Sequence, residues 1–109
     1  MFLVRRVFRA RDKKVWEAAS VIDEIGREYE KAGQRNESKI YLSANTTPGE
    51  YGLIYMEWTA EVLESVYRGD NEIPSRIHQE LGPMLRDLVD EQWIEFYELL
   101  TPDKKRMPS

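Results

Sequence analysis

The sequence predicts an α+β fold in which one four-stranded antiparallel sheet carries helices on one of its faces. Four segments alternate between apolar and polar residues with a period of two, which is typical of half-buried strands. A segment with apolar residues at helical spacing separates the first two strands, and another separates the last two. The chain has 109 residues. That length suits one domain with one core, so we expect a single domain over residues 1–100 and a polar tail over residues 101–109.

The first strand and the first helix are expected at the start of the chain. Residues 2–10 alternate, and Asp12 is placed to cap the helix that follows. The helix is expected over residues 13–32, with its end at Gly33. Its apolar stripe consists of Val15, Ala18, Ala19, Ile22, Ile25, Tyr29 and Ala32.

A hairpin is expected in the middle of the chain. Residues 39–45 and 51–58 both alternate, and Pro48 and Gly49 between them suit the two central positions of a type II turn. Proline presets the first turn dihedral, and glycine accepts the positive φ of the second. Thr59 is then expected to cap a short helix.

The second half closes with a longer helix and a fourth strand. The helix is expected over residues 74–90, with Pro74 at its first position. Pro83 has no N–H to donate to the helical ladder, so a kink or a break is expected near Gly82. The last strand is expected over residues 92–100.

The element order β-α-β-β-α-β is the split βαβ, or ferredoxin-like, arrangement, and right-handed crossovers place the strands in the order 4-1-3-2. The helices then cover one face of the sheet, and we expect the other face to lie open. The open face receives these side chains: Leu3, Arg5, Val7, Tyr41, Ser43, Asn45, Leu53, Tyr55, Glu57, Trp93, Glu95, Tyr97 and Leu99.

This second face predicts a homodimer. It is too apolar and aromatic to meet water over a whole sheet, and too charged for the interior of a monomer. Two copies that pack through it bury the same patch twice and enclose a barrel-like space.

At this point residues 2–100 resemble the dimeric α/β-barrel superfamily, in element order, length and strand faces. That superfamily includes antibiotic-biosynthesis monooxygenases, haem-degrading monooxygenases, EthD-like and NIPSNAP-like proteins. The resemblance implies a dimeric barrel. Cofactor-independent oxygenases of the superfamily use pocket aromatic and polar groups, a role for which Trp93, Tyr55 and Asn45 are candidates.

The candidate site centres on Arg5. With strand one between strands three and four, Arg5 is expected opposite Glu57 and Glu95, and a guanidinium between two carboxylates stays ionised. One interpretation is an ion-pair network that serves the sheet; the other is the polar anchor of a ligand pocket. A bulge near Arg5 would bring Arg6 into its place. The predicted ligand-binding residues are Arg5, Tyr41, Asn45, Tyr55, Glu57, Trp93, Glu95 and Tyr97.

His78 is the single histidine, and it neighbours the apolar stripe of its helix without belonging to it. A solvent-facing or capping role is expected, and Glu80 is too close in sequence to share its helix face as a second metal ligand. The haem-degrading relatives combine a helix histidine, comparable to His78, with a strand tryptophan, comparable to Trp58, and an asparagine on the first strand. Strand one here has no asparagine. No metal and no cofactor are expected.

Composition excludes several classes of function. The net charge of −4 and the acidic Glu57 and Glu95 disfavour nucleic acid, including the RNA-recognition domains that share this element order. No apolar run is long enough to span a membrane, and the absence of cysteine fits a cytoplasmic protein.

The sequence therefore predicts a cytoplasmic homodimer that binds a small, partly apolar ligand in a cavity between sheet and helices. The alternatives are a small cofactor-independent monooxygenase-like enzyme and a purely structural oligomer without a ligand.

Overall fold

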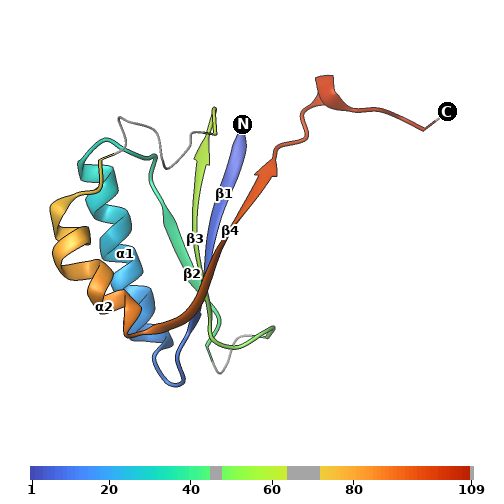
Figure 1. The fold of residues 1–109 in the computed structure, drawn as a ribbon. Coiled ribbons are helices and arrows are strands. Elements are labelled where there is room, and N and C mark those ends of the chain that lie inside the picture. Colours follow the sequence, from blue (N-terminus) through green and yellow to red (C-terminus); the bar gives the residue numbers. More distant parts are fainter. Residues whose placement is uncertain (45–47, 64–71, 109) are drawn as a thin grey trace.

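The computed structural model describes residues 1–44, 48–63 and 72–108, and it shows the predicted two layers (Figure 1). Helices pack on one side of a four-stranded sheet, and the chain beyond the last strand runs away from both layers. The elements are β1 (Phe2–Ala10), α1 (Val15–Lys31), β2 (Lys39–Leu42), β3 (Leu53–Ala60), the π-helical turn η1 (Ile77–Leu81), α2 (Gly82–Arg86), β4 (Val89–Glu98) and the 3₁₀ turn η2 (Pro102–Lys104).

The sheet confirms the predicted topology. Its strand order is β2-β3-β1-β4, which is the predicted 4-1-3-2 read from the other edge, and each neighbouring pair is antiparallel. The register between β1 and β4 is continuous from Phe2 to Arg9 and shifts only between Arg9 and Ala10. No bulge therefore occurs at Arg5, and Arg5 keeps its predicted place.

The core fills the layer between α1 and the sheet. The apolar stripe of α1 meets the alternate residues of β1 and β3, and Ile22, Ile54 and Met56 are fully buried. Each such side chain contributes about 1.5–3 kcal/mol through removal of apolar surface from water. Their shared cluster fixes which side of every strand is covered, and hence which side is open.

Several predicted element boundaries are wrong, and those of β3 and β4 differ most in consequence. β3 runs through Ala60, so Thr59 pairs with Leu3 in the sheet instead of capping a helix. Residues 64–71 of the predicted short helix lie outside the described residues. β4 begins at Val89, where a helix was expected to continue, because Val89 pairs with Ala10 after the shift in register.

The expected interruption near Gly82 takes the form of a π turn. The Gly82 N–H donates to the Ile77 carbonyl oxygen, five residues back. Pro83 has no N–H to donate, which fits a change of helical hydrogen bonding at this point. A Cβ on Gly82 would lie 2.9 Å from the Ile77 oxygen, so the close approach needs glycine.

The hairpin is shorter in its strands than predicted. β2 ends at Leu42 and β3 begins at Leu53, although Ser43 still exchanges backbone hydrogen bonds with Gly52 and Leu53. Gly49 has a φ of +115°, the positive value expected of the predicted turn. No helix in the described parts of the chain is long and apolar enough to cross a membrane.

Candidate functional site

The predicted site residues lie on the side of the sheet away from the helices. Phe8 packs in the core, and side chains alternate along a strand, so Arg5 and Val7 of β1 point to the opposite side. The register carries the same assignment to β3 and β4. We call this side the open face; its side chains are Leu3, Arg5, Val7, Arg9, Lys39, Tyr41, Leu53, Tyr55, Glu57, Thr59, Glu91, Trp93, Glu95 and Tyr97.

Arg5 occupies the centre of the open face. It pairs in register with Glu57 on β3 and with Glu95 on β4, as predicted. Its Nε lies 2.6 Å from Glu57 Oε2, and its Nη1 lies 3.6 Å from Glu95 Oε1. The hydrogen bond with Glu57 raises the pKa of Arg5, so this guanidinium remains charged.

Glu95 collects three donors around one carboxylate. Its Oε2 accepts a hydrogen bond of 2.9 Å from the Trp93 indole, and its Oε1 accepts one of 2.8 Å from the Tyr97 hydroxyl. These bonds, together with the charge of Arg5, lower the pKa of Glu95. In return, the bond to Glu95 raises the pKa of the Tyr97 hydroxyl.

The aromatic side chains divide into two groups. Tyr55 and Trp93 flank Val7 in register and are half-buried, and Val7 itself is only 1% exposed. Tyr41 and Tyr97 instead are 52% and 46% exposed. The open face therefore has a small apolar floor of its own, with the more exposed tyrosines above it.

The guanidinium of Arg5 also contacts this aromatic layer. Its Cζ lies 5.6 Å from the ring centre of Tyr55 and 5.1 Å from that of Tyr97, within the range of cation–π attraction. The arginine thus already occupies the cation position between these rings. An incoming ligand would meet a site in which the central cation has both carboxylate and aromatic partners.

A second arginine cluster on the same face was not predicted. Arg9 Nε lies 3.0 Å from Glu91 Oε1, and Arg9 Nη1 lies 2.8 Å from Glu50 Oε1. The sequence did contain a signal: in an antiparallel pair, moving four residues forward from Arg5 and four back from Glu95 gives Arg9 opposite Glu91. Glu50 comes from the hairpin connection, whose conformation the strand pattern does not determine.

These groups are suited to holding charge and not to moving protons near neutral pH. The pKa of Glu95 is lowered and that of Tyr97 is raised, so both shifts lead away from the operating range of a general acid or base. Lys39, opposite Glu57 in register, adds a third cation to Arg5 and Arg9, against the carboxylates of Glu57, Glu91 and Glu95 on the strands and of Glu50 in the hairpin connection. The geometry favours recognition or assembly over acid–base catalysis by these residues.

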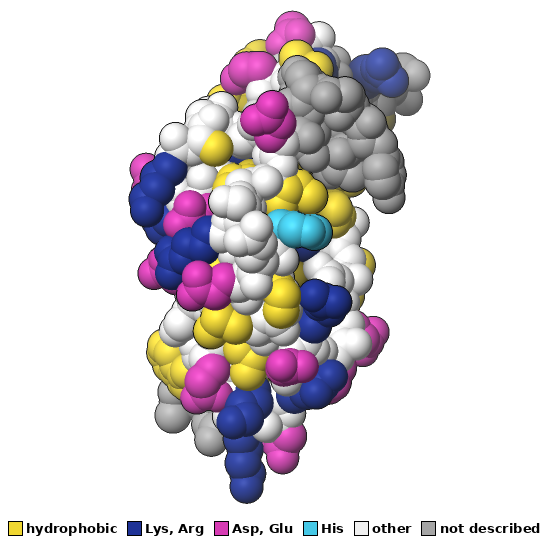
Figure 2. Space-filling model, turned by 60° about the vertical axis from the view of Figure 1, so that its left-hand side comes forward, with side chains coloured by type: hydrophobic (Ala, Val, Ile, Leu, Met, Phe, Trp, Pro, Cys, Tyr) yellow, Lys and Arg dark blue, Asp and Glu magenta, His cyan; other side chains and the backbone are white. Residues whose placement is uncertain are grey.

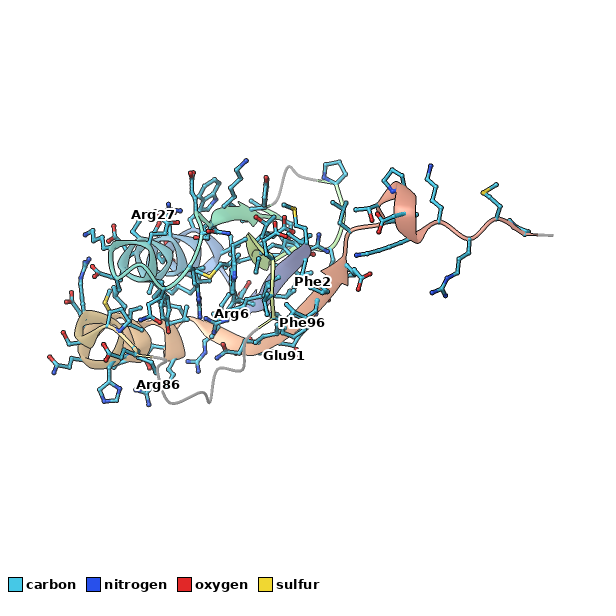
Figure 3. All side chains as sticks on the ribbon, turned by 90° about the horizontal axis from the view of Figure 1, so that it is seen from above. Phe2, Arg6, Arg27, Arg86, Glu91 and Phe96 are labelled. Carbon is cyan, nitrogen blue, oxygen red and sulfur yellow. The ribbon has the colours of Figure 1, made fainter. Side chains whose placement is uncertain are left out.

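The cavity expected between sheet and helices is not where the predicted residues lie. The described side chains of that layer form the buried cluster, whereas the predicted residues project from the other side of the sheet. Arg6 does point toward the helical layer (Figure 3), where it contacts Phe8 and donates a hydrogen bond of 2.9 Å to Gln92. Burial lowers the pKa of Arg6.

Two further predicted positions lie outside this face. His78 is exposed on the helical layer, and Figure 2 shows the histidine at the surface there. Among the described residues, no three His, Asp or Glu side chains gather as a metal site. Asn45 lies outside the described residues, so its predicted contact with a ligand stays a prediction.

Comparison with known proteins identifies the fold. No family model and no curated protein matches the chain. Solved structures do match: an uncharacterised NIPSNAP domain protein from Burkholderia xenovorans is 14% identical, with 94% of this chain and 97% of that chain covered and a TM-score of 0.57. A NIPSNAP family protein from Agrobacterium tumefaciens is 17% identical over 93% of both chains, with a TM-score of 0.60.

A third similar structure is described as a dimeric protein of unknown function with a ferredoxin-like fold, from Bacteroides fragilis. It is 16% identical, covers 90% of this chain and 96% of its own, and has a TM-score of 0.54. At these identities the similarity concerns the fold. The chain has the ferredoxin-like fold of NIPSNAP-like small proteins, as the strand order predicted.

Proposed function

We propose that the protein acts as a homodimer whose two open faces pack together and enclose a site for a small, partly apolar ligand. The observation that supports this most directly is the combination of paired charges and exposed apolar groups on one face. Arg5 and Arg9 have carboxylate partners on the same side of the sheet, so neither guanidinium would be buried without a partner. Tyr41 and Tyr97 stand exposed above them.

β4 adds to this argument because large side chains are exposed on both of its sides. Ile94 and Phe96, on the helical side, are 45% and 55% exposed, and Tyr97 on the open face is 46% exposed. A strand that leaves aromatic rings in water on both sides is an incomplete packing unit. A second copy packed on the open face would cover Tyr97, whereas Ile94 and Phe96 lie on the other side of the strand.

The size of the face is compatible with a dimer of ordinary strength. Four strands about 4.8 Å apart and about eight residues long, at about 3.3 Å each, span roughly 19 by 26 Å, or roughly 500 Å² of plane. Stable interfaces bury about 800 Å² on each partner. The relief of the side chains raises the accessible area above that of the plane, so the open face lies near the lower end of stable interfaces.

The dimer is tested by sedimentation velocity over a dilution series. Tyr41→Glu places a charge on the open face and is expected to weaken the dimer by about tenfold or more, since an unpaired charge is costly in an interface. The matched control is Tyr51→Glu, at a tyrosine that is 44% exposed in the hairpin connection. A wild-type protein that stays monomeric at high concentration, or equal effects of the two variants, would overturn the proposal.

The ligand site is tested separately by equilibrium dialysis against riboflavin, haem and an anthraquinone polyketide, with oxygen uptake recorded. We expect micromolar binding of at least one probe without turnover. Tyr97→Phe removes the hydroxyl that bonds Glu95 and is expected to weaken that binding with the dimer intact. Oxygen uptake would favour a monooxygenase-like enzyme, and a dimer that binds none of the probes would be a structural oligomer.

A further inference from the structure

The chain beyond β4 forms an arm that has little contact with the folded body. We define the arm as residues 99–108; Figure 1 shows it running away from the far edge of the sheet, and Figure 3 shows the same from above. Leu99, Leu100 and Met107 are 52%, 67% and 83% exposed. Lys104 Nζ lies 3.1 Å from Glu98 Oε2, and this ion pair connects the turn η2 to the end of β4.

A shallow groove runs along the opposite edge of the molecule, between α1 and the edge strand β2. Its volume is about 420 Å³. Trp16 stands beside it with 63% of its surface exposed, an unusual state for the largest apolar side chain. As the outermost strand of the described sheet, β2 also has backbone groups on its outer side that no described strand pairs. The groove is lined by Trp16, Ala19, Ser20, Asp23, Ile40 and Leu42.

The groove side of the molecule carries an excess of carboxylates. Arg27 pairs with Asp23 and Glu30. Arg76 pairs with Glu24, Glu28 and Glu80, and Lys31 pairs with Glu28, so five carboxylates face three cationic side chains.

The arm has the opposite charge. It contains Lys104, Lys105 and Arg106 against the single carboxylate of Asp103. Lys105 and Arg106 are exposed, next to the exposed thioether of Met107. A basic segment with an apolar tip therefore matches an acidic groove with an exposed indole, since thioether–aromatic contacts and charge complementarity both favour the pairing.

We propose that the arm of one copy lies in the groove between α1 and β2 of a second copy, with Met107 against Trp16. The arm and the groove belong to opposite edges of the sheet, with β4 at one end of the strand order and β2 at the other, so the contact joins two copies. A two-fold axis parallel to the strands brings β4 of one copy beside β2 of its partner. Met107 is nine residues beyond Glu98, three of them in η2, so the arm reaches roughly 26 Å. The groove residue Leu42 is in line with Phe8, and Glu98 is opposite Phe2, so the groove lies about six residues, or roughly 20 Å, along the strands from the start of the arm.

This inference rests on the proposed homodimer and adds to it. The open face alone is near the lower limit of a stable interface, and two arms that cross to the partner would enlarge it on both sides. In the same arrangement, the exposed side chains of Leu100 and Met107 of each arm would pack against the surface of the partner.

The absence of cysteine makes a direct test possible. A Met107→Cys variant is mixed with a differently tagged Ser20→Cys variant and oxidised mildly. We expect a disulfide-linked heterodimer on a non-reducing gel, because Ser20 lines the groove. The control mixes Met107→Cys with Thr59→Cys, because Thr59 is exposed on the open-face side of β3. A disulfide that forms preferentially with Cys at position 59 would place the arm on the open face and overturn the proposal.

A second measurement separates this proposal from that of the dimer. A chain that lacks residues 101–109 is expected to dissociate at about tenfold higher concentration than the wild type. A wild-type dimer that is sensitive to Tyr41→Glu, unaffected by the truncation and free of the Ser20 link would refute the arm contact alone. A dimer that depends on the arm and ignores Tyr41→Glu would refute the open-face packing and keep the arm contact.

Discussion

The ion pair between Arg5 and Glu57 should contribute more to stability than its counterpart at Arg9 and Glu91. Arg5 Nε lies 2.6 Å from Glu57 Oε2, and the two side chains are 30% and 20% exposed. Hydrogen bonds to charged groups contribute about 1.5–3 kcal/mol, and fully exposed pairs about 0.2–1 kcal/mol. Because solvent still reaches this pair, we expect a coupling energy of about 1–2 kcal/mol.

The pair of Arg9 and Glu91 is the control on the same face: its arginine also comes from β1, four residues along, and its carboxylate comes from β4 instead of β3. Its Nε–Oε1 distance is 3.0 Å, but Glu91 is 60% exposed, so a weaker coupling than that between Arg5 and Glu57 is expected. Each double-mutant cycle uses Arg→Met and Glu→Gln, with urea unfolding at one fixed protein concentration. A coupling at Arg5 no larger than the one at Arg9 would refute the reasoning from burial.

Two further predictions follow from burial and from the pKa of Glu95. Ile54→Ala should lower the free energy of unfolding by about 3 kcal/mol, because Ile54 is fully buried. Ile94 is 45% exposed, so Ile94→Ala should lower it by less than about 1 kcal/mol. Equal losses of free energy in urea unfolding would contradict the assigned core. Since the folded-state pKa of Glu95 is lowered, its stabilising effect is present above the usual glutamate pKa and is lost as pH falls through the folded value. Urea midpoints of wild type and Glu95→Gln should therefore converge as the pH falls below the usual glutamate pKa of about 4.3, and parallel curves would argue against the shift.

The sequence predicted the pairing of Arg5 with Glu57 and Glu95 because alternation and strand order are both long-range regularities. Once β1 lies between β3 and β4, period-two alternation decides which side chains share a face. The observed register confirms this part of the prediction. The same reasoning, carried four residues along the strands, would have found the contact between Arg9 and Glu91.

What the sequence did not predict depends on side-chain conformation and on element ends. Tyr55 and Trp93 flank Val7 and leave it 1% exposed, a packing that the alternation did not specify, and their expected place in the wall of a pocket stays a prediction. The period-two alternation of a strand predicts on which side of the sheet a ring lies, but it does not determine the side-chain rotamer. The ends of β3 and β4 were also misplaced, because sheet pairing outweighed the local signals for a cap at Thr59 and for a helix through Val89.

The adjacent arginines of β1 show why the ion pairs of the open face have a structural role whatever the ligand. Arg5 meets two carboxylates on the open face, whereas Arg6 projects to the helical side, where it contacts Phe8 and bonds to Gln92. A slip of β1 by one residue would turn Arg5 into the apolar core, away from its carboxylates, at a large desolvation cost. The charges thus help to fix the register. Removal of Arg5 would disturb the sheet as well as any site, so ligand contact is better tested by Tyr97→Phe, which leaves the ion pairs in place.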